Sequence, residues 1–316
     1  TSGANNVAVG ASSLENNTTG NKNTAIGHSA MFTNVGAGHC NVAIGADALY
    51  ANTTGDGNVA MGFEALKANT TAGDNIAIGF CSQRDTTTGA YNTSMGSYSM
   101  CDNTTGSQNV AIGLNSMNKL QSTNNNTAVG ANTMRCATTG VDNTAIGESS
   151  GTALTTGDLN AFLGNDSGAN TTTGSGNVAL GKTAGTDAVF NITTQSDRFV
   201  AGHNSISNAY VKVDWTVTSD ERDKMNFEEV PHGLDFVNQL KPVSFKFKKS
   251  RENNTPHGPQ KYGFKAQDIL ALEGDNNVII DNDNDENLKV TNSHLIPVLV
   301  KAIQELKAEI EELKKK

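Results

Sequence analysis

The first part of the chain carries a short apolar pattern that returns at a nearly constant interval. The pentapeptide Asn-x-Ala-(Ile/Val/Met)-Gly, or a close variant, begins at Asn6, Asn23, Asn41, Asn58, Asn75, Asn92, Asn109, Asn126, Asn143, Asn160 and Asn177. The interval is 17 residues, except for one of 18 after Asn23. Such self-similarity predicts a solenoid of stacked coils, because so short a unit buries apolar side chains only against its neighbours.

Each repeat reads as two short strands joined by turns. In "NVAIG" the second and fourth residues point one way and Ala and Gly the other. We expect the bulky side to fill the coil, the small Ala/Gly side to face another surface, and Asn and Gly to serve tight turns. A third apolar column follows each Gly by four residues and comprises Leu14, Met31, Leu49, Leu66, Met100, Met117 and Met134. It becomes Gly151, Gly168 and Gly185 in the last repeats, which predicts closer backbone packing there.

The pattern changes after residue 218, where apolar residues follow the periods of helices and longer strands. Residues 234–248 predict a helix that ends before Pro242 and then a strand with Val243, Phe245 and Phe247 on one face. Residues 261–270 predict a strand entering a helix. Residues 277–280 and 287–290 predict a hairpin around an acidic turn.

The last segment, about residues 293–316, predicts a helix with a heptad seam. Its apolar positions, spaced 3, 4, 3, 4 and 3, are Ile296, Leu299, Ile303, Leu306, Ile310 and Leu313. The helix either packs on its own domain or forms an intermolecular coiled coil, and the strict period favours the coil. Ile at a and Leu at d favour two strands. We expect the repeat region, with far more surface, to set the number of chains.

The density of charged residues changes along the chain and predicts a domain boundary near Ser219. Residues 1–218 carry 8 basic and 14 acidic groups, whereas the shorter stretch 219–316 carries 15 and 18. The net charge of −9 argues against nucleic acid as a partner. No run of about 20 apolar residues predicts a membrane span. We expect no metal or cofactor, and free thiols at the four cysteines, Cys40, Cys81, Cys101 and Cys136.

Two motifs imitate binding sites. Residues 176–183 satisfy the phosphate-loop pattern GxxxxGK[ST], but the repeat dictates Asn177 to Gly181, so we interpret the motif as one more repeat. Residues 281–287, "DNDNDEN", are similar to a calcium loop that lacks Gly at its sixth and Glu at its twelfth position. We interpret them as a solvated turn.

The boundary itself carries the one candidate for chemistry. In "TSDERDK", residues 218–224, Ser219 and Lys224 lie five residues apart. A lysine that takes the proton of a serine hydroxyl turns it into a nucleophile, and a scissile bond held beside it needs no substrate binding. From the spacing alone the stretch is better explained as an exposed turn.

Two resemblances add to this interpretation. Residues 5–185 resemble the head repeat of trimeric autotransporter adhesins, a left-handed β-roll in which three chains pack side by side. Residues 215–316, through "TSDERDK", "GLDFVNQLKPVSFKFK", "YGFKAQDI" and "PVLVKAIQELK", resemble the self-cleaving intramolecular chaperone of phage endosialidases, tail fibres, large-virus capsid fibres and myelin regulatory factor.

The second resemblance implies a chaperone that helps three chains to fold and then cuts itself off. It places Ser219 on the nucleophile and Lys224 on the general base, and Asp220 and Arg222 on motif positions without an assigned role. The cut adjoins Ser219, on the side of Thr218 or of Asp220. The geometry of an acyl shift favours the Thr218–Ser219 bond.

The sequence therefore predicts a mainly β homotrimer. Residues 1–185 form the left-handed β-roll, or solenoid, residues 186–218 a connector, and residues 219–316 a small α+β chaperone that ends in a coiled-coil helix. We expect a viral fibre or tailspike segment, assembled in the host cytoplasm and carried on the virion, that is an autoproteolytic Ser–Lys peptidase without other activity. Its partners are other copies of itself and a host-surface receptor or glycan. The alternative is a passive adhesin head or ice-binding solenoid without proteolytic activity.

Overall fold

The computed structural model describes residues 2–187, 190–206, 209–212, 217–248, 251–274, 277–282 and 285–316. The chain forms two compact units that meet between Asn204 and Ser205, and each is considered by itself. None of the helices among the described residues combines the length and the apolar character needed to cross a bilayer.

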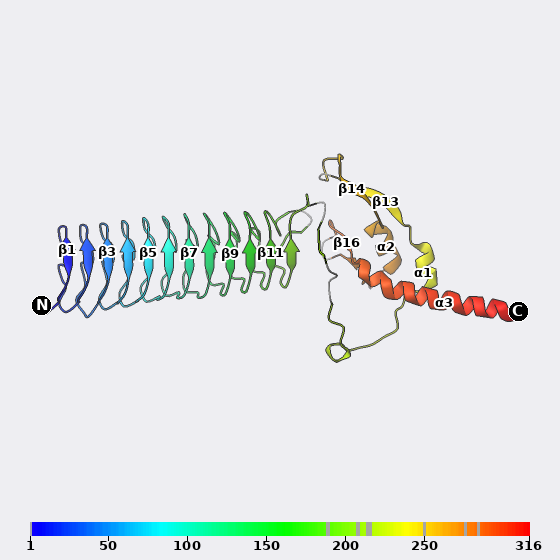
Figure 1. Cartoon of the computed structure of the whole chain (residues 1–316), viewed down its shortest axis with the longest axis horizontal. Helices are drawn as coiled ribbons and strands as arrows, with labels where there is room; N and C mark the ends of the chain where they lie inside the picture. The colour runs from blue at the N-terminus through cyan, green and yellow to red at the C-terminus, as the bar shows by residue number, and fades with distance from the viewer. Residues whose placement is uncertain are drawn as a thin grey trace. The chain divides into compact units, whose positions relative to one another are not determined.

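The first unit is a β-solenoid with one parallel sheet, whose strands follow one another in chain order (Figure 1). The strands are β1 (Val7–Val9), β2 (Thr24–Ile26), β3 (Val42–Ile44), β4 (Val59–Met61), β5 (Ile76–Ile78), β6 (Thr93–Met95), β7 (Val110–Ile112), β8 (Thr127–Val129), β9 (Thr144–Ile146), β10 (Ala161–Leu163), β11 (Val178–Leu180) and β12 (Phe199–Ala201). Equivalent repeat positions pair, as Val42 pairs with Val59. The predicted β-solenoid is confirmed. It continues one strand beyond residue 185, where the sequence pattern had ended.

Each repeat contributes one strand, so the expectation of two strands per repeat is wrong. The other side of the coil is a series of turns that also bond from coil to coil, as Leu49 N–H donates to Ala65 O at 2.9 Å. Leu49 has a φ of 53°, and the other third-column residues share this left-handed conformation. A regular strand cannot pass through such a residue.

The sheet faces the opposite way to the sequence prediction. The strand alanines, such as Ala43 and Ala60, are fully buried, whereas the bulky residues beside them point outward and include Val9, Ile26, Met61 and Ile76 among the exposed side chains. The coil is narrow, and its interior is already occupied by the third column and the asparagines. Only a methyl group fits inward from the strand, and the apolar face remains on the outside.

Glycine occurs at the end of each strand for a different reason from the one expected. At Gly45, with φ of 132°, a Cβ atom would lie 2.5 Å from the carbonyl oxygen of Gly62 in the next coil. Glycine is therefore required because successive backbones touch. The strand alanines are enclosed in the solenoid, so they cannot form the contact between chains that the sequence suggested.

The third column fills the core as predicted, and a polar layer divides it. Gln83 occupies the column between Leu66 and Met100, and its Nε2 donates to Ile76 O and Ser94 Oγ, each at 2.9 Å. Separate apolar clusters lie on the two sides of this layer. If the coil of Gln83 stacked one repeat out of step, the Gln83 amide would face Ala111, which cannot form the hydrogen bond that Ser94 forms. The layer therefore favours one stacking order.

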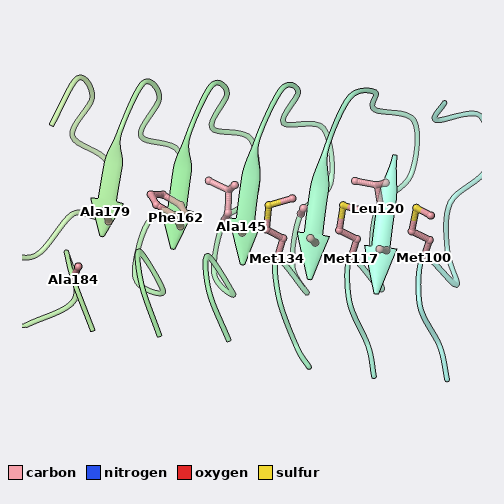
Figure 2. Packing of buried hydrophobic residues seen from close by; sticks show 12 residues of the cluster. Met100, Met117, Leu120, Met134, Ala145, Phe162, Ala179 and Ala184 are labelled. Carbon is pink, nitrogen blue, oxygen red and sulfur yellow. The ribbon is translucent and has the colours of Figure 1, made fainter. Parts of the chain in front are cut away.

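The glycines that end the third column make room for one aromatic ring. Figure 2 shows Met100, Met117 and Met134 in one column and Phe162 further along, beyond the coil of Ala145. Phe162 stands at an inward strand position that is alanine in most repeats, and it is buried. A Cβ atom on Gly151 or Gly168 would lie 2.9 Å or 2.6 Å from its ring. In these coils the large apolar side chain that fills the interior comes from the strand and not from the turn side.

We expect Gly168→Ala to destabilise the solenoid by about 2–4 kcal/mol, because it adds strain at a positive φ and overpacks the ring. Chemical denaturation followed by circular dichroism measures the change. In a Phe162→Ala background the added methyl has space, so the same substitution should cost about 1 kcal/mol, the backbone strain alone. Equal losses in both backgrounds would contradict this packing.

The repeated asparagine forms a buried ladder, which corrects its expected role as a turn residue. Asn92 Oδ1 accepts from Asn109 N–H at 3.0 Å, and Asn92 Nδ2 donates to Gly106 O at 2.8 Å. The same contacts recur along the solenoid, and these side chains are at most 1% exposed from Asn23 to Asn177. The left-handed turn residue is instead the one before each asparagine, such as Tyr91 with φ of 60°.

The segment that satisfies the phosphate-loop pattern, residues 176–183, belongs to a solenoid coil and takes part in the asparagine ladder. Asn177 Nδ2 donates to Asn160 Oδ1 at 3.1 Å, and β11 lies inside the motif, where a phosphate loop has its backbone N–H groups free. The calcium-like stretch, residues 281–287, includes residues 283–284, which lie outside the described residues. Its flanking strands do form the predicted hairpin.

The second unit combines short helices and hairpins. Its elements are η1 (Glu221–Asp223), α1 (Leu234–Gln239), β13 (Val243–Lys248), β14 (Pro256–Gly263), α2 (Ala266–Glu273), β15 (Ile280–Asp281), β16 (Lys289–Val290), η2 (Asn292–His294) and α3 (Leu295–Lys315). The antiparallel pairs β13–β14 and β15–β16, and the helices, lie where the sequence predicts them. Phe236, Ile269, Ile279, Ile280, Leu295 and Val298 form the core.

The buried Glu273 ties α2 to β15 in this core. Its Oε1 accepts from Val278 N–H at 2.9 Å and Ile279 N–H at 2.7 Å, and its Oε2 accepts from Ile280 N–H at 3.0 Å. Three charge-assisted bonds satisfy a carboxylate that would otherwise be costly to bury. The sequence pattern gave no sign of this residue, which stands at the end of a helix among other acidic groups.

Helix α3 has two apolar faces: it packs on its own domain, as one interpretation of the heptad had it, and the intermolecular coiled coil stays a prediction. Leu295, Val298 and Ala302 are buried against the chain's own domain. The six seam residues, Ile296, Leu299, Ile303, Leu306, Ile310 and Leu313, are between 43% and 67% exposed. The helix is anchored at its first half and leaves the complete seam uncovered within one chain.

Candidate active site

The candidate site lies on an exposed segment between the solenoid and α1. Residues 217–229 have no regular secondary structure apart from the single turn η1. Ser219 and Lys224 are both exposed. Lys224 Nζ donates to Ser219 Oγ at 2.7 Å. The structure thus brings the two predicted residues into hydrogen-bond contact, and their catalytic role stays a prediction.

Asp220 and Arg222 build the turn that makes this contact. Asp220 is the N-cap of η1, where its Oδ1 accepts from Arg222 N–H at 2.9 Å. The Arg222 guanidinium returns to the same carboxylate, with Nε–Oδ1 at 3.0 Å and Nη2–Oδ2 at 2.6 Å. The turn closes through Lys224 N–H, which donates to Glu221 O at 3.1 Å. Two motif positions without an assigned role are therefore structural.

The electrostatics of the turn follow from this pairing. The Arg222 guanidinium, and to a lesser degree its backbone N–H, hold the pKa of Asp220 below its usual value. Asp220 reciprocally raises the pKa of Arg222. Both groups stay charged at neutral pH. An Asp at an N-cap two residues before an Arg is a local sequence signal that identifies such a turn.

The chemistry that the pair offers is nucleophilic attack by a serine. A lysine accepts the serine proton only as a neutral amine, and removal of water favours that form. In one chain Ser219 and Lys224 both face solvent. Thr218 is also exposed, and Asp220 is half-buried. The bonds on both sides of Ser219 are therefore accessible to a covering surface.

One other cluster in the described part of the chain has metal-ligand spacing. Asp85, Cys101 and Asp102 offer ligand atoms within 4.8 Å of one another. However, Arg84 already occupies both carboxylate oxygens of Asp85, at 2.8 Å and 2.7 Å. Burial raises the pKa of the Cys101 thiol to about 12. These residues fit an ion pair beside a packed thiol better than a metal site, and all four cysteines carry free thiols.

A β-solenoid followed by a small chaperone-like domain fits the class of fibre- and tailspike-like proteins. Residues 219–278 match the family model described as chaperone of endosialidase, so the chain carries such a domain after its solenoid. The family is classed as a peptidase family, which implies autoproteolytic activity in general terms. The matched segment begins at Ser219 and ends before α3. No curated protein and no solved structure matches the chain.

Proposed function

We propose that this chain is a segment of a homotrimeric viral fibre whose C-terminal chaperone directs assembly and then releases itself by cleavage next to Ser219. The observation that carries the proposal is the 2.7 Å contact between Lys224 Nζ and Ser219 Oγ at the start of the matched domain. Solenoid and chaperone then have successive tasks in one assembly pathway.

Two exposed apolar surfaces support assembly with further copies. The seam of α3 is one, and the outward face of β1–β11 is the other, with Val7, Val9, Ile26, Met61, Ile76, Met95, Ile112, Ile146, Leu163 and Leu180 exposed. A row of apolar side chains along a whole sheet is unfavourable in water, and identical rows on identical chains can cover one another. This outward face replaces the Ala/Gly side as the proposed contact between chains.

In this proposal the C-terminal domain sets the register in which the repeats of neighbouring chains pair. Nearly identical coils in neighbouring chains can pair out of step at little local cost. A coil that assembles first at the C-terminus aligns the chains before the sheets meet. A neighbouring chain laid over residues 217–224 would also exclude water from Lys224, which favours the neutral amine.

The cleavage step uses only these groups and one water molecule. Lys224 takes the Ser219 hydroxyl proton, Oγ attacks the Thr218 carbonyl carbon, and the Thr218–Ser219 amide breaks as Lys224 returns the proton to the leaving nitrogen. Water then hydrolyses the resulting ester and leaves a carboxylate on Thr218 and a free amine on Ser219. The start of the family match at Ser219 supports this bond over the Ser219–Asp220 bond.

A denaturing gel of wild type, Ser219→Ala and Lys224→Ala tests cleavage. We expect the 316-residue wild type to give fragments of about 218 and 98 residues, and both variants to stay intact. Arg222→Lys, which removes the two-pronged contact with Asp220 but keeps both reacting groups, should cleave more slowly. N-terminal sequencing of the small fragment should begin at Ser219. Intact chains in every lane would refute the peptidase, and a start at Asp220 would refute the acyl shift.

Attachment to a host-surface receptor or glycan, and a place on the virion, belong to the same proposal. The passive alternative is a head or ice-binding solenoid that stays uncut. Ice binding needs free threonine hydroxyls on a flat face. Here the first threonine of the turn donates to the next coil, as Thr53 Oγ1 to Thr70 O at 2.8 Å and Thr138 Oγ1 to Thr155 O at 3.1 Å. The hydroxyls of these first threonines are used internally, so they do not form a free column.

A further inference from the structure

Helix α3 is fastened to the segment that follows the candidate site by two side chains, Lys301 and Glu305, here called the clamp. Lys301 Nζ donates to Val230 O at 2.6 Å, and Glu305 Oε2 accepts from Leu234 N–H at 2.6 Å. Both bonds join positions 71 residues apart in the chain. In Figure 1, α1 lies next to α3, and the two helices pack on one another.

The fit at Glu305 is close and specific. Gly233 is the N-cap of α1 and has no side chain to bond the first turn, so Glu305 supplies the missing acceptor from another helix. A Cβ atom on Gly233 would collide with the Glu305 carboxylate. Beneath the clamp, Phe236 packs in the same core as Leu295 and Val298. The clamp therefore holds residues 230–236 in one place on α3.

The clamp joins the helix that carries the seam to the segment that follows the candidate site in the chain. Lys301 and Glu305 stand on the same turns of α3 as the exposed Leu299, Ile303 and Leu306. Lys224 is only six residues before Val230, and a chain of six residues spans at most about 20 Å. Whatever position the seam takes against a neighbouring chain therefore limits where Ser219 and Lys224 can lie.

We propose that Lys301 and Glu305 are positioning residues that couple assembly at the seam to self-cleavage at Ser219. This proposal rests on the proposed peptidase activity. Neither residue touches the reacting atoms, and both lie outside the segment that matches the family model. Their role is to convert the register of the coil into a fixed placement of the exposed segment on the neighbouring chain, where a small displacement is costly to the rate.

The test compares a clamp variant with a matched control in the full chain. Lys301→Met/Glu305→Ala breaks the clamp. Lys307→Met/Glu311→Ala removes the i,i+4 pair further along α3, which lies 4.0 Å apart and is more exposed. Each is also made with a foreign trimeric coiled coil fused after Lys316, which enforces assembly. Cleavage is followed on gels after cell-free synthesis, and chain number is measured by light scattering in a Ser219→Ala background.

We expect the clamp variant to cleave at least tenfold more slowly than wild type, even when the fused coil makes it fully trimeric. Gly233→Ala should give the same defect by displacing the Glu305 carboxylate without altering α3, and Lys301→Arg should restore most of the rate. The control pair should cleave normally. If the fused clamp variant cleaves at the wild-type rate, the clamp only aids assembly and this proposal is wrong. If wild type and control also stay intact, the peptidase proposal fails instead.

Discussion

Ile303→Asp/Leu306→Asp is expected to leave the chain monomeric and uncut. Burial of each seam side chain in a coiled coil contributes about 1.5–3 kcal/mol, and every copy contributes the same positions. A carboxylate in the seam removes that gain and adds the cost of burying or repelling like charges. Because the buried face of α3 is formed by Leu295, Val298 and Ala302, the fold of the single chain should survive.

Light scattering of the Ser219→Ala form measures the assembly, and a gel of the otherwise native chain measures cleavage. Gln304→Asp is the control, since it adds one carboxylate at an exposed position outside the seam. It should remain trimeric and cleave. A seam variant that is monomeric but fully cleaved would separate the two activities, and a trimeric one would show that α3 does not hold the chains together.

Asn92→Leu is expected to lower the stability of the solenoid by about 3 kcal/mol or more. The substitution leaves the buried Asn109 N–H without its acceptor and removes the donor to Gly106 O. Each buried polar group that loses its partner costs about 1–3 kcal/mol. Because each coil contacts only its neighbours, amide exchange should accelerate chiefly in β6 and β7.

The control for this prediction is Asn124→Leu, the same change at an exposed asparagine that accepts from Ser107 N–H at 2.8 Å. Water can replace that contact, so the effect should stay within about 0.5 kcal/mol. Denaturation midpoints and hydrogen exchange measure both variants. Equal losses at the two positions would show that the ladder adds no more than an exposed turn.

The sequence predicted the solenoid well because the signal is repeated. The third column, from Leu14 to Met134, is buried as its spacing indicated. The direction of the strand faces was wrong, although alternation correctly separated the two sides. Alternation says which residues share a side, but the volume inside the coil decides which side is inward. That volume depends on Asn92 and its equivalents. Because asparagine is polar, its residue type alone does not predict that these side chains are buried.

The candidate site was predicted by residue type and by resemblance, and its geometry was not. Ser219 and Lys224 were named from the sequence, whereas the roles of Asp220 and Arg222 emerged only with the turn that they form. Glu273, Lys301 and Glu305 gave no signal, because each is one acidic or basic residue on a helix among many. Their partners are backbone groups, which leave no trace in the sequence.

Periodicity and residue type by themselves determined the repeat, its interval, a change of architecture after the repeats, the heptad of α3 and the two candidate reacting residues. These features are local, and adjacent positions suffice to specify them. The tertiary structure decided which face of the sheet is exposed, that α3 serves its own domain and keeps its seam free, and that the segment after Lys224 is fastened to α3. Each of these depends on contacts between distant positions and on the space they leave, which no local pattern encodes.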